Sequence, residues 1–313
     1  MRTSLGLRAS GVFVTLALLA GCGAAGNQTL PAAAGVAPAA YRAASGALLY
    51  VVDDGAATVS YYSYPKMKKA GALTGFGSVN GACVDAKGDV FIPDGGNYEV
   101  DEFAHGGTKI VRKLKDLDFY LEGCAIDPVT GNLAVATQPR NSSPGGVVIF
   151  AQAKGKAKNL DASGVYLPSH CAYDGNGDLF LDGQDTMGYF RLTELPAKSK
   201  TFVPIELDES ITVPGGVHWD GKYLAVGDQG AGYRGSDVYR FAISGSSGTT
   251  VSKVALLGSS EVADFWLNGS RLIAPDHGRS ASAVKIWKYP AGGYPVKTYS
   301  DGFVDPIADA VSP

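Results

Sequence analysis

The chain has 313 residues, and 27 Lys and Arg stand against 30 Asp and Glu, which gives a formal net charge of −3 at pH 7. Its positive charges form no basic run, which argues against a nucleic-acid partner and against electrostatic binding to anionic lipid. The four cysteines imply no disulfide framework, because one of them has the separate role described next and three cannot all pair.

The N-terminus is predicted to be an export signal over residues 1–21. Arg2 and Arg8 precede an apolar run over residues 9–20, and small residues follow this run. This run is shorter than the ~20 residues that a transmembrane helix needs, whereas it suits a cleaved signal peptide. The signal ends in Leu19-Ala20-Gly21-Cys22, which resembles the bacterial lipobox. The resemblance implies that Cys22 accepts a diacylglycerol and becomes the first residue of the mature chain.

Lipidation of Cys22 predicts an extracytoplasmic protein held to a membrane of the cell envelope, because two or more acyl chains anchor a protein stably. Gly23 follows in place of the Asp that tends to retain lipoproteins at the inner membrane of enteric bacteria, and this favours the outer membrane. Residues 22–46 are rich in Ala, Gly and Pro with almost no charge. They are predicted to form a flexible tether.

From residue 47 onward, an apolar strand that usually ends in Asp recurs six times. The first residues of successive copies lie 41 to 48 positions apart, a period that suits one four-stranded blade per repeat. The six copies begin at Leu49, Val90, Leu133, Leu179, Leu224 and Leu272.

A second strand, rich in small residues, lies just upstream of the last five copies and begins at Gly81, Gly123, His170, Gly216 and Asp264. The first copy has no such strand before it, and residues 309–313 supply one at the far end of the chain. Alternating and more polar segments downstream complete four strands per repeat, and helical periodicity is nearly absent. The sequence therefore predicts an all-β fold: a six-bladed β-propeller over residues 47–313, closed by pairing of the C-terminal strand with the N-terminal blade.

The second repeat resembles the NHL repeat, and more loosely the gluconolactonase-like and TolB-type propellers. The residues that carry the resemblance are 81–92, with Asp94, Asn97, Val100 and Phe103, while Glu99 stands where the NHL pattern usually has Arg. The resemblance implies the propeller fold and no particular activity, because propellers include hydrolases, lyases and binding scaffolds.

Alignment of the inner strands predicts one residue of each at the channel mouth. The polar members of this set, with the residues just before them, are Asn80, Glu122, His170, Asp264 and Asp309. Such groups could bind a divalent cation, Ca²⁺ or Zn²⁺, whose bound water could hydrolyse an ester or a lactone. The resemblance to gluconolactonase-like propellers also implies a metal here, without a residue-by-residue match. The alternative is that these groups are solvated and hydrogen-bond to turns.

The loops at one end of the predicted blades are tight hairpins, whereas those at the other end vary in length and carry polar residues. Variable loops on a rigid scaffold commonly bind ligands, and the candidate residues on them are Arg140, Arg234, His277 and Arg279. The leading hypothesis is therefore a binding scaffold for a protein or small molecule. The second is a metal-dependent hydrolase or lyase at the channel mouth.

Several smaller signals have two interpretations. Cys83, Cys124 and Cys171 are predicted to be small packing residues near the axis, with a Cys124–Cys171 disulfide as the alternative. Residues 174–178 resemble a calcium loop, but Leu179 stands where such a loop needs Gly, which favours a hairpin turn. The glycine pattern of residues 230–235 has no helix after it to bind a phosphate, and it predicts a long loop.

Aromatic side chains precede several of the inner strands. They could line a cleft for a sugar or peptide, or they could fill the space between blades. The five residues are Phe76, Phe119, Tyr120, Tyr166 and Phe303.

Overall fold

The computed structural model describes residues 46–115, 117–141, 145–162, 164–230, 235–278 and 282–313. Within these ranges every regular element is a β-strand except one three-residue 3-10 helix, η1 (Ala151–Ala153). No helix in the described ranges is long and apolar enough to cross a membrane. The all-β class predicted from the sequence is confirmed.

Strands that follow one another in the sequence pair antiparallel in groups of four. The first sheet has the order β24 (Pro306–Ser312), β1 (Leu48–Asp53), β2 (Thr58–Ser63) and β3 (Lys68–Leu73). The second contains β4 (Cys83–Val84), β5 (Val90–Asp94), β6 (Glu99–Phe103) and β7 (Ile110–Leu114). The third contains β8 (Tyr120–Ile126), β9 (Leu133–Gln138), β10 (Gly146–Phe150) and β11 (Ala157–Asp161).

The remaining twelve strands form three further antiparallel runs, joined at their outer edges by short parallel contacts of β19 with β15 and β23. The first run is β12 (Leu167–Tyr173), β13 (Leu179–Gln184), β14 (Phe190–Leu195) and β15 (Val203–Leu207). The second is β16 (Pro214–Trp219), β17 (Leu224–Asp228), β18 (Ser236–Ser244) and β19 (Ser247–Leu256). The third is β20 (Trp266–Asn268), β21 (Arg271–Asp276), β22 (Ala283–Lys288) and β23 (Gly292–Tyr299).

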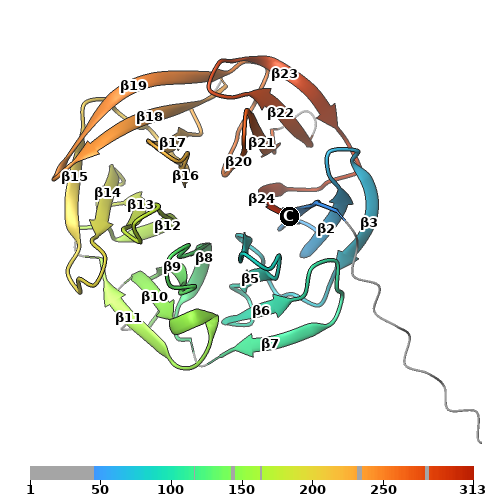
Figure 1. Ribbon diagram of the computed structural model, residues 1–313, viewed down its shortest axis with the longest axis horizontal. Helices are drawn as coiled ribbons and strands as arrows, with labels where there is room; N and C mark the ends of the chain where they lie inside the picture. Colours follow the sequence, from blue (N-terminus) through green and yellow to red (C-terminus); the bar gives the residue numbers. More distant parts are fainter. Residues whose placement is uncertain (1–45, 116, 142–144, 163, 231–234, 279–281) are drawn as a thin grey trace, which may run out of the picture. The chain divides into compact units, whose positions relative to one another are not determined.

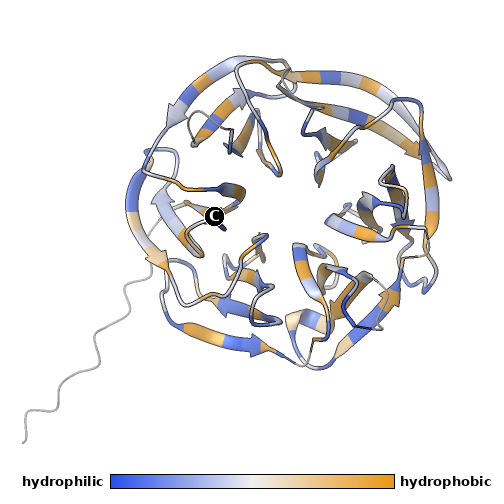
Figure 2. Cartoon of the chain, turned by 180° about the vertical axis from the view of Figure 1, so that it is seen from behind, coloured by the Kyte–Doolittle hydropathy of each residue, from blue (hydrophilic) through white to orange (hydrophobic). Residues whose placement is uncertain are grey.

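The sheets stand around a common axis, as the blades of a β-propeller do (Figure 1). In each group the first strand lies nearest the axis and the fourth lies outermost, while β24 takes the innermost place beside β1. Figure 2 shows apolar residues concentrated on the inner strands and polar residues interspersed along the outer ones. The apolar core is therefore divided among the spaces between neighbouring sheets.

Strand β1 shows why the strong strands of the repeat are continuously apolar. Successive side chains of a strand point to opposite faces of its sheet. Leu48, Tyr50 and Val52 pack on one side with the sheet of β5, and Leu49 and Val51 pack on the other side with the sheet of β21. Both faces are buried over residues 48–52, so a polar side chain at any of these five positions would lose apolar contact.

In most sheets the apolar strand next to the innermost one carries a buried Asp at or near its end, and this Asp accepts backbone hydrogen bonds. Asp94 accepts from the backbone N–H of Gly77, Ser78 and Asn97. Asp53, Asp228 and Asp276 accept in the same way from loops that lead into the inner strands, whereas Asp182 accepts from the backbone N–H of His170 within β12. A buried N–H without a partner costs about 1–3 kcal/mol, and so Asp53, Asp94, Asp228 and Asp276 each fix the loop that enters their own sheet.

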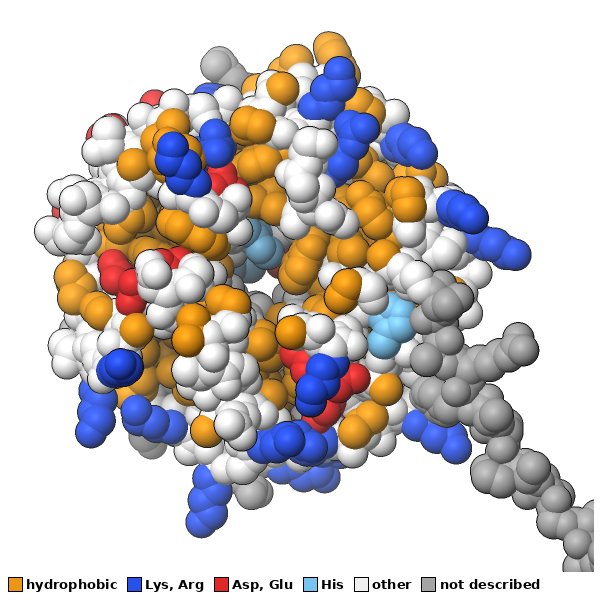
Figure 3. All heavy atoms as spheres, viewed as in Figure 1, with side chains coloured by type: hydrophobic (Ala, Val, Ile, Leu, Met, Phe, Trp, Pro, Cys, Tyr) orange, Lys and Arg blue, Asp and Glu red, His pale blue; other side chains and the backbone are white. Residues whose placement is uncertain are grey.

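The two ends of the sheets differ in their loops. At one end, here called the hairpin end, turns join the first and second strands, and Asp85, Asp127, Asp174 and Asp220 each accept from backbone N–H groups two to four residues ahead. The turn at Asp174 is thus a hairpin and not a calcium loop. Figure 3 shows this end, with apolar side chains around its centre. The opposite end, which carries the Asp-fixed loops, is called the loop end.

Candidate functional site

At the loop end of the axis, polar side chains line a cavity of about 250 Å³. Asn80, Glu122 and His170 are among the lining residues, together with Gln184 and Gln229. Three of the five side chains predicted as metal ligands therefore share one cavity. Asp264 and Asp309, the other two, do not line it.

His170 carries the strongest electrostatic signal in this cavity. Its Nδ1 lies 3.3 Å from Asp182 Oδ1 and 3.2 Å from the backbone N of Gly216. Burial alone would lower the pKa of His170, but the Asp182 carboxylate, with smaller contributions from Asp264 and Glu122, outweighs it and raises the pKa to about 9. The nearby negative charges therefore favour the imidazolium at pH 7 over a neutral ring that accepts from Gly216.

Glu122 faces the same cavity with a pKa raised to about 7. Burial is the main cause, Asp54 adds to it, and the positive charge on His170 opposes it. At neutral pH this carboxyl is therefore divided between its two protonation states. A carboxyl group poised in this way can exchange protons, although structural networks shift pKa values as much as catalytic ones do.

Asp264 is held by a histidine that the sequence analysis missed. Its Oδ1 lies 3.1 Å from Nε2 of His218 and also accepts from the backbone N of Phe265. The His218 ring packs against Phe265 and Trp266, with centroids 4.8 and 5.7 Å away. Strand alternation was the available signal, because His218 comes two residues after the aligned Gly216 and so shares its side of the strand.

Asp309 does not occupy the place at the mouth that the alignment predicts. In the first sheet Asp309 pairs with Val51, just as Cys171 pairs with Leu181, so its equivalent is Cys171 and not His170. The alignment was one residue out of register, and this moves the side chain to the other face of the strand. Asp309 is fully buried, and neither carboxylate oxygen has a hydrogen-bond partner among the described residues. Burial and then the nearby Asp264 raise its pKa well above the ordinary value.

The predicted ligands do not form a compact set. Among the described residues, the group of three or more acidic, His or Cys side chains whose ligand atoms all lie within 4.8 Å of one another is Asp94, Glu99 and Asp101. The amide of Asn80 donates to the backbone O of Leu121 at 2.9 Å. These side chains therefore do not fit a preformed metal centre, and a Ca²⁺ or Zn²⁺ ion at the mouth stays a prediction.

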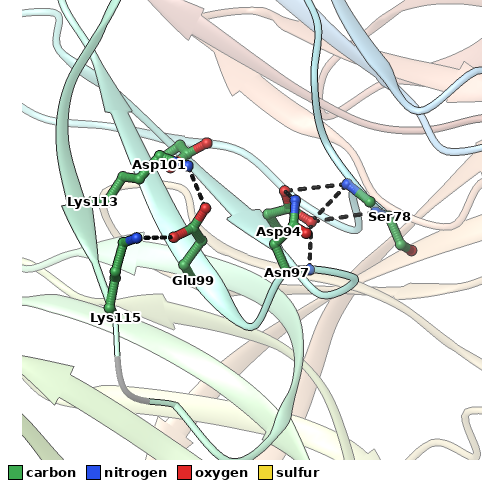
Figure 4. Close-up of polar contacts among 8 residues, drawn as sticks. Ser78, Asp94, Asn97, Glu99, Asp101, Lys113 and Lys115 are labelled. Carbon is green, nitrogen blue, oxygen red and sulfur yellow. Dashed lines mark hydrogen bonds and ion pairs between the residues drawn. The ribbon is translucent and has the colours of Figure 1, made fainter.

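The compact acidic group is itself committed to other contacts (Figure 4). Both oxygens of Asp94 already accept hydrogen bonds, from the backbone N–H groups of Gly77, Ser78 and Asn97 and from the Asn97 amide. Lys113 pairs with Glu99 and, at 3.5 Å, with Asp101, and Lys115 lies 3.5 Å from Glu99. The Lys113 and Lys115 ammonium groups thus offset part of the charge of this cluster, including that of Glu99, which stands where the NHL pattern has Arg.

The four residues predicted for the binding loops are only partly described. Arg140 stacks on the ring of Tyr98 at 3.9 Å and pairs with Asp118. His277 Nδ1 lies 3.1 Å from Asp305 Oδ1. Arg234 and Arg279 lie outside the described residues. Arg140 and His277 therefore both reach the loop end, on different sheets.

The aromatic residues before the inner strands divide by type. Phe119 is buried between the second and third sheets, Phe76 packs edge-on against Phe103, and Phe303 packs against Tyr62. These phenylalanines fill space between sheets. Tyr120 and Tyr166, in contrast, are exposed.

Three further aromatic or Met side chains at the loop end were not selected by the sequence analysis, and of these Tyr98 is partly buried while Met187 and Tyr189 are exposed. Tyr98 has its ring 5.9 Å from that of Tyr120. Met187 and Tyr189 follow β13 and are 76% and 58% exposed. Their position just after an apolar strand of the repeat was the signal that could have identified them.

The cysteines were predicted as free packing residues, and two of them instead form a disulfide. Cys83 and Cys124 join the inner strands of the second and third sheets, with their Cα atoms 5.6 Å apart. The alternative Cys124–Cys171 bridge is wrong. Cys171 is buried and free, and burial raises the pKa of its thiol, which makes it a poor nucleophile. The alignment did not indicate the observed pair, because Cys83 lies one register position away from Cys124.

Comparison with solved structures agrees with this architecture. A chain in a crystal structure of a nidogen/laminin complex matches with a TM-score of 0.69 and 12% sequence identity, over 86% of this chain and 99% of that one. A protein of unknown function from Bacteroides caccae matches with a TM-score of 0.62, also at 12% identity and over the same shares of the two chains. The fold is that of a β-propeller protein. No protein-family model and no curated protein matches the sequence.

The buried carboxyl of Asp309 generates a prediction about pH. Because its pKa is raised in the folded state, the folded chain binds more protons than the unfolded chain, and stability falls as pH rises above the unfolded value near 3.8. Glu122 adds a fall between pH 4.5 and about 7. His170 adds another between pH 6.5 and about 9.

We expect Asp309→Asn to reduce the loss of unfolding free energy between pH 5 and pH 8 by at least about 1.4 kcal/mol, the equivalent of one pKa unit. Urea unfolding at the two pH values measures it, with exposed Asp161→Asn as the control. Equal pH dependence in Asp309→Asn and the parent chain would contradict an unpartnered carboxyl.

Proposed function

We propose that this chain is a lipid-tethered, extracytoplasmic β-propeller that acts as a protein-binding scaffold through its loop end. The observation that carries the proposal is the set of exposed aromatic and Met side chains there: Tyr120, Tyr166, Met187 and Tyr189. Tyr and Met are enriched at protein interfaces, and Tyr at their energetic centres. The Arg140–Tyr98 stack adds a positioned cation beside them.

The matched nidogen/laminin structure supports the same proposal, because it is the structure of a complex. At 12% identity the likeness concerns the fold, and the partner of this chain does not follow from it. The hydrolase or lyase alternative has no comparable support, because its five candidate ligands do not converge.

The scaffold is proposed to be a closed ring of six blades. Two contacts support closure: β24 pairs with β1 over six residue pairs, and an apolar cluster joins the last sheet to the first. In that cluster Leu49, Val51 and Val311 of the first sheet meet Ile273 and Val284 of the last. A closed ring presents its loops on one rigid face.

Closure predicts that deletion of residues 306–313 lowers the unfolding free energy by at least about 3 kcal/mol, because ladder hydrogen bonds contribute about 1 kcal/mol each and apolar contacts are lost as well. Thermal and urea unfolding measure the change, and deletion of the exposed Pro313 alone is the control. A truncated chain as stable as its parent would favour an open array.

The tether is proposed from the Leu19-Ala20-Gly21-Cys22 motif. We expect Cys22→Ser to abolish incorporation of labelled palmitate and to move the protein from the detergent phase to the aqueous phase of a Triton X-114 separation. Cys171→Ser, which replaces a buried free thiol, is the matched control and should keep both properties. Labelled lipid on the Cys22→Ser chain would rule out this anchor.

Binding through the loop end is tested by a photoreactive amino acid placed at Tyr166 and, as the control, at Tyr294, which is 74% exposed on the outer strand β23. Irradiated cells should give a discrete cross-linked protein from position 166 only. Tyr120→Ser should reduce that product about tenfold or more, because truncation of an aromatic anchor typically costs about 2 kcal/mol. Equal products from positions 166 and 294 would refute binding by this face.

A further inference from the structure

The hairpin end of the axis carries a ring of apolar side chains at one register position. The apolar strands of the repeat begin at Leu49, Val90, Leu133, Leu179, Leu224 and Leu272. In every sheet the innermost strand places an apolar residue opposite this first residue. These residues, here called the hairpin-end ring, are Val84, Ile126, Tyr173, Trp219, Leu267 and Val311. All but Val311 are partly exposed. Soluble proteins rarely leave such a contiguous apolar patch exposed unless it binds something.

Five members of this ring line a cavity of about 510 Å³. Trp266 and His218 line it as well, and so do both cysteines of the Cys83–Cys124 disulfide. Figure 3 shows the apolar side chains around the centre of this face. The volume falls within the range of about 300–1,000 Å³ that is typical of small-molecule sites.

The charges at the cavity favour an uncharged occupant. No Lys or Arg stands among the described residues that line it. Its one acidic lining residue, Asp174, already accepts from the backbone N–H of Asn176 and Asp178 and from the Asn176 amide. Nε2 of His218 is bonded to Asp264. Neither a free anion nor a free cation is therefore present to pair with a charged ligand.

The shapes of the lining side chains favour a planar occupant. Tyr173, Trp219 and Trp266 bring three large rings to one cavity, and the His218 ring lies beside Trp266. Aromatic rings prefer offset-stacked or edge-to-face contact with another ring. Sulfur atoms, which the disulfide supplies here, also make favourable contacts with ring edges.

We propose that the hairpin end of the axis binds a neutral, planar aromatic molecule between Tyr173, Trp219 and Trp266. This site is separate from the protein-binding loop end, because the two lie at opposite ends of the inner strands. Neither site depends on the other for its contacts.

The proposal is tested on the purified chain with N-phenyl-1-naphthylamine, a neutral aromatic probe that fluoresces in apolar sites. The chain has three tryptophans, of which Trp219 and Trp266 line the cavity and Trp287 is fully buried. Saturable binding should therefore quench tryptophan emission through energy transfer to the probe. Trp219→Ala should weaken binding about tenfold or more, whereas Trp219→Phe, which keeps a ring, should retain most of it.

Two matched controls separate this site from the rest of the surface. Tyr166→Ser at the loop end and Tyr294→Ser on β23 each remove an exposed ring elsewhere and should leave probe affinity unchanged. Loss of binding in Tyr166→Ser would place the probe at the loop end and overturn the proposal. Circular dichroism of each variant establishes that it is folded.

A second substitution and a second ligand complete the test. Ile126→Asp places an unpaired charge in the cavity at the hairpin end and should abolish binding. If it does not fold, Leu267→Ala supplies the same comparison, with weaker binding expected. Dodecanol, a flexible apolar chain, should compete poorly with the probe. Equal competition by dodecanol, or unchanged affinity in Trp219→Ala, would overturn the proposal.

Discussion

The structure depends on one repeated contact, the buried carboxylate at the end of the second strand. A carboxylate removed from water is costly unless its oxygens accept hydrogen bonds, and here backbone N–H groups of the entering loop supply them. Asp94 is the fullest case, with three backbone donors and the amide of Asn97. The same contact recurs at Asp53, Asp228 and Asp276. It lets the loops vary in sequence while their entry points stay fixed.

The two ends of the axis differ because of this arrangement. The loop end brings together His170, Glu122 and Asp182. There the Asp182 carboxylate outweighs burial and raises the pKa of His170, while burial raises the pKa of Glu122. At the hairpin end, the turns are satisfied internally by their own Asp residues, so the strands can end in apolar side chains. The cavity at the loop end is therefore polar and titratable, whereas the cavity at the hairpin end is mainly apolar, with Asp174 as its one acidic lining residue.

The period of the apolar strands was enough to predict the all-β class, the strand groups and the hairpin at Asp174, because burial on both faces imposes a continuous apolar run. Register was harder to predict. Asp309 was misplaced by one residue, since β24 lacks the preceding small-residue motif and its ladder with β1 carries an irregularity at Val52 and Asp53. The Cys83–Cys124 disulfide was missed because the two cysteines differ by one register position in their strands. His218 was missed because side-chain alternation along β16 was not followed.

Pairing of the last strand with the first also sets an order for the nascent chain. β1, β2 and β3 are made early, yet the innermost partner of β1 is β24, whose residues are synthesised only after those of β2 to β23. Until they arrive, the edge of β1 has unpaired backbone groups, and contacts of such long sequence separation form slowly. The first sheet to emerge is therefore the last to be completed, and a chain that stalls late in synthesis leaves that edge open to pairing with other chains.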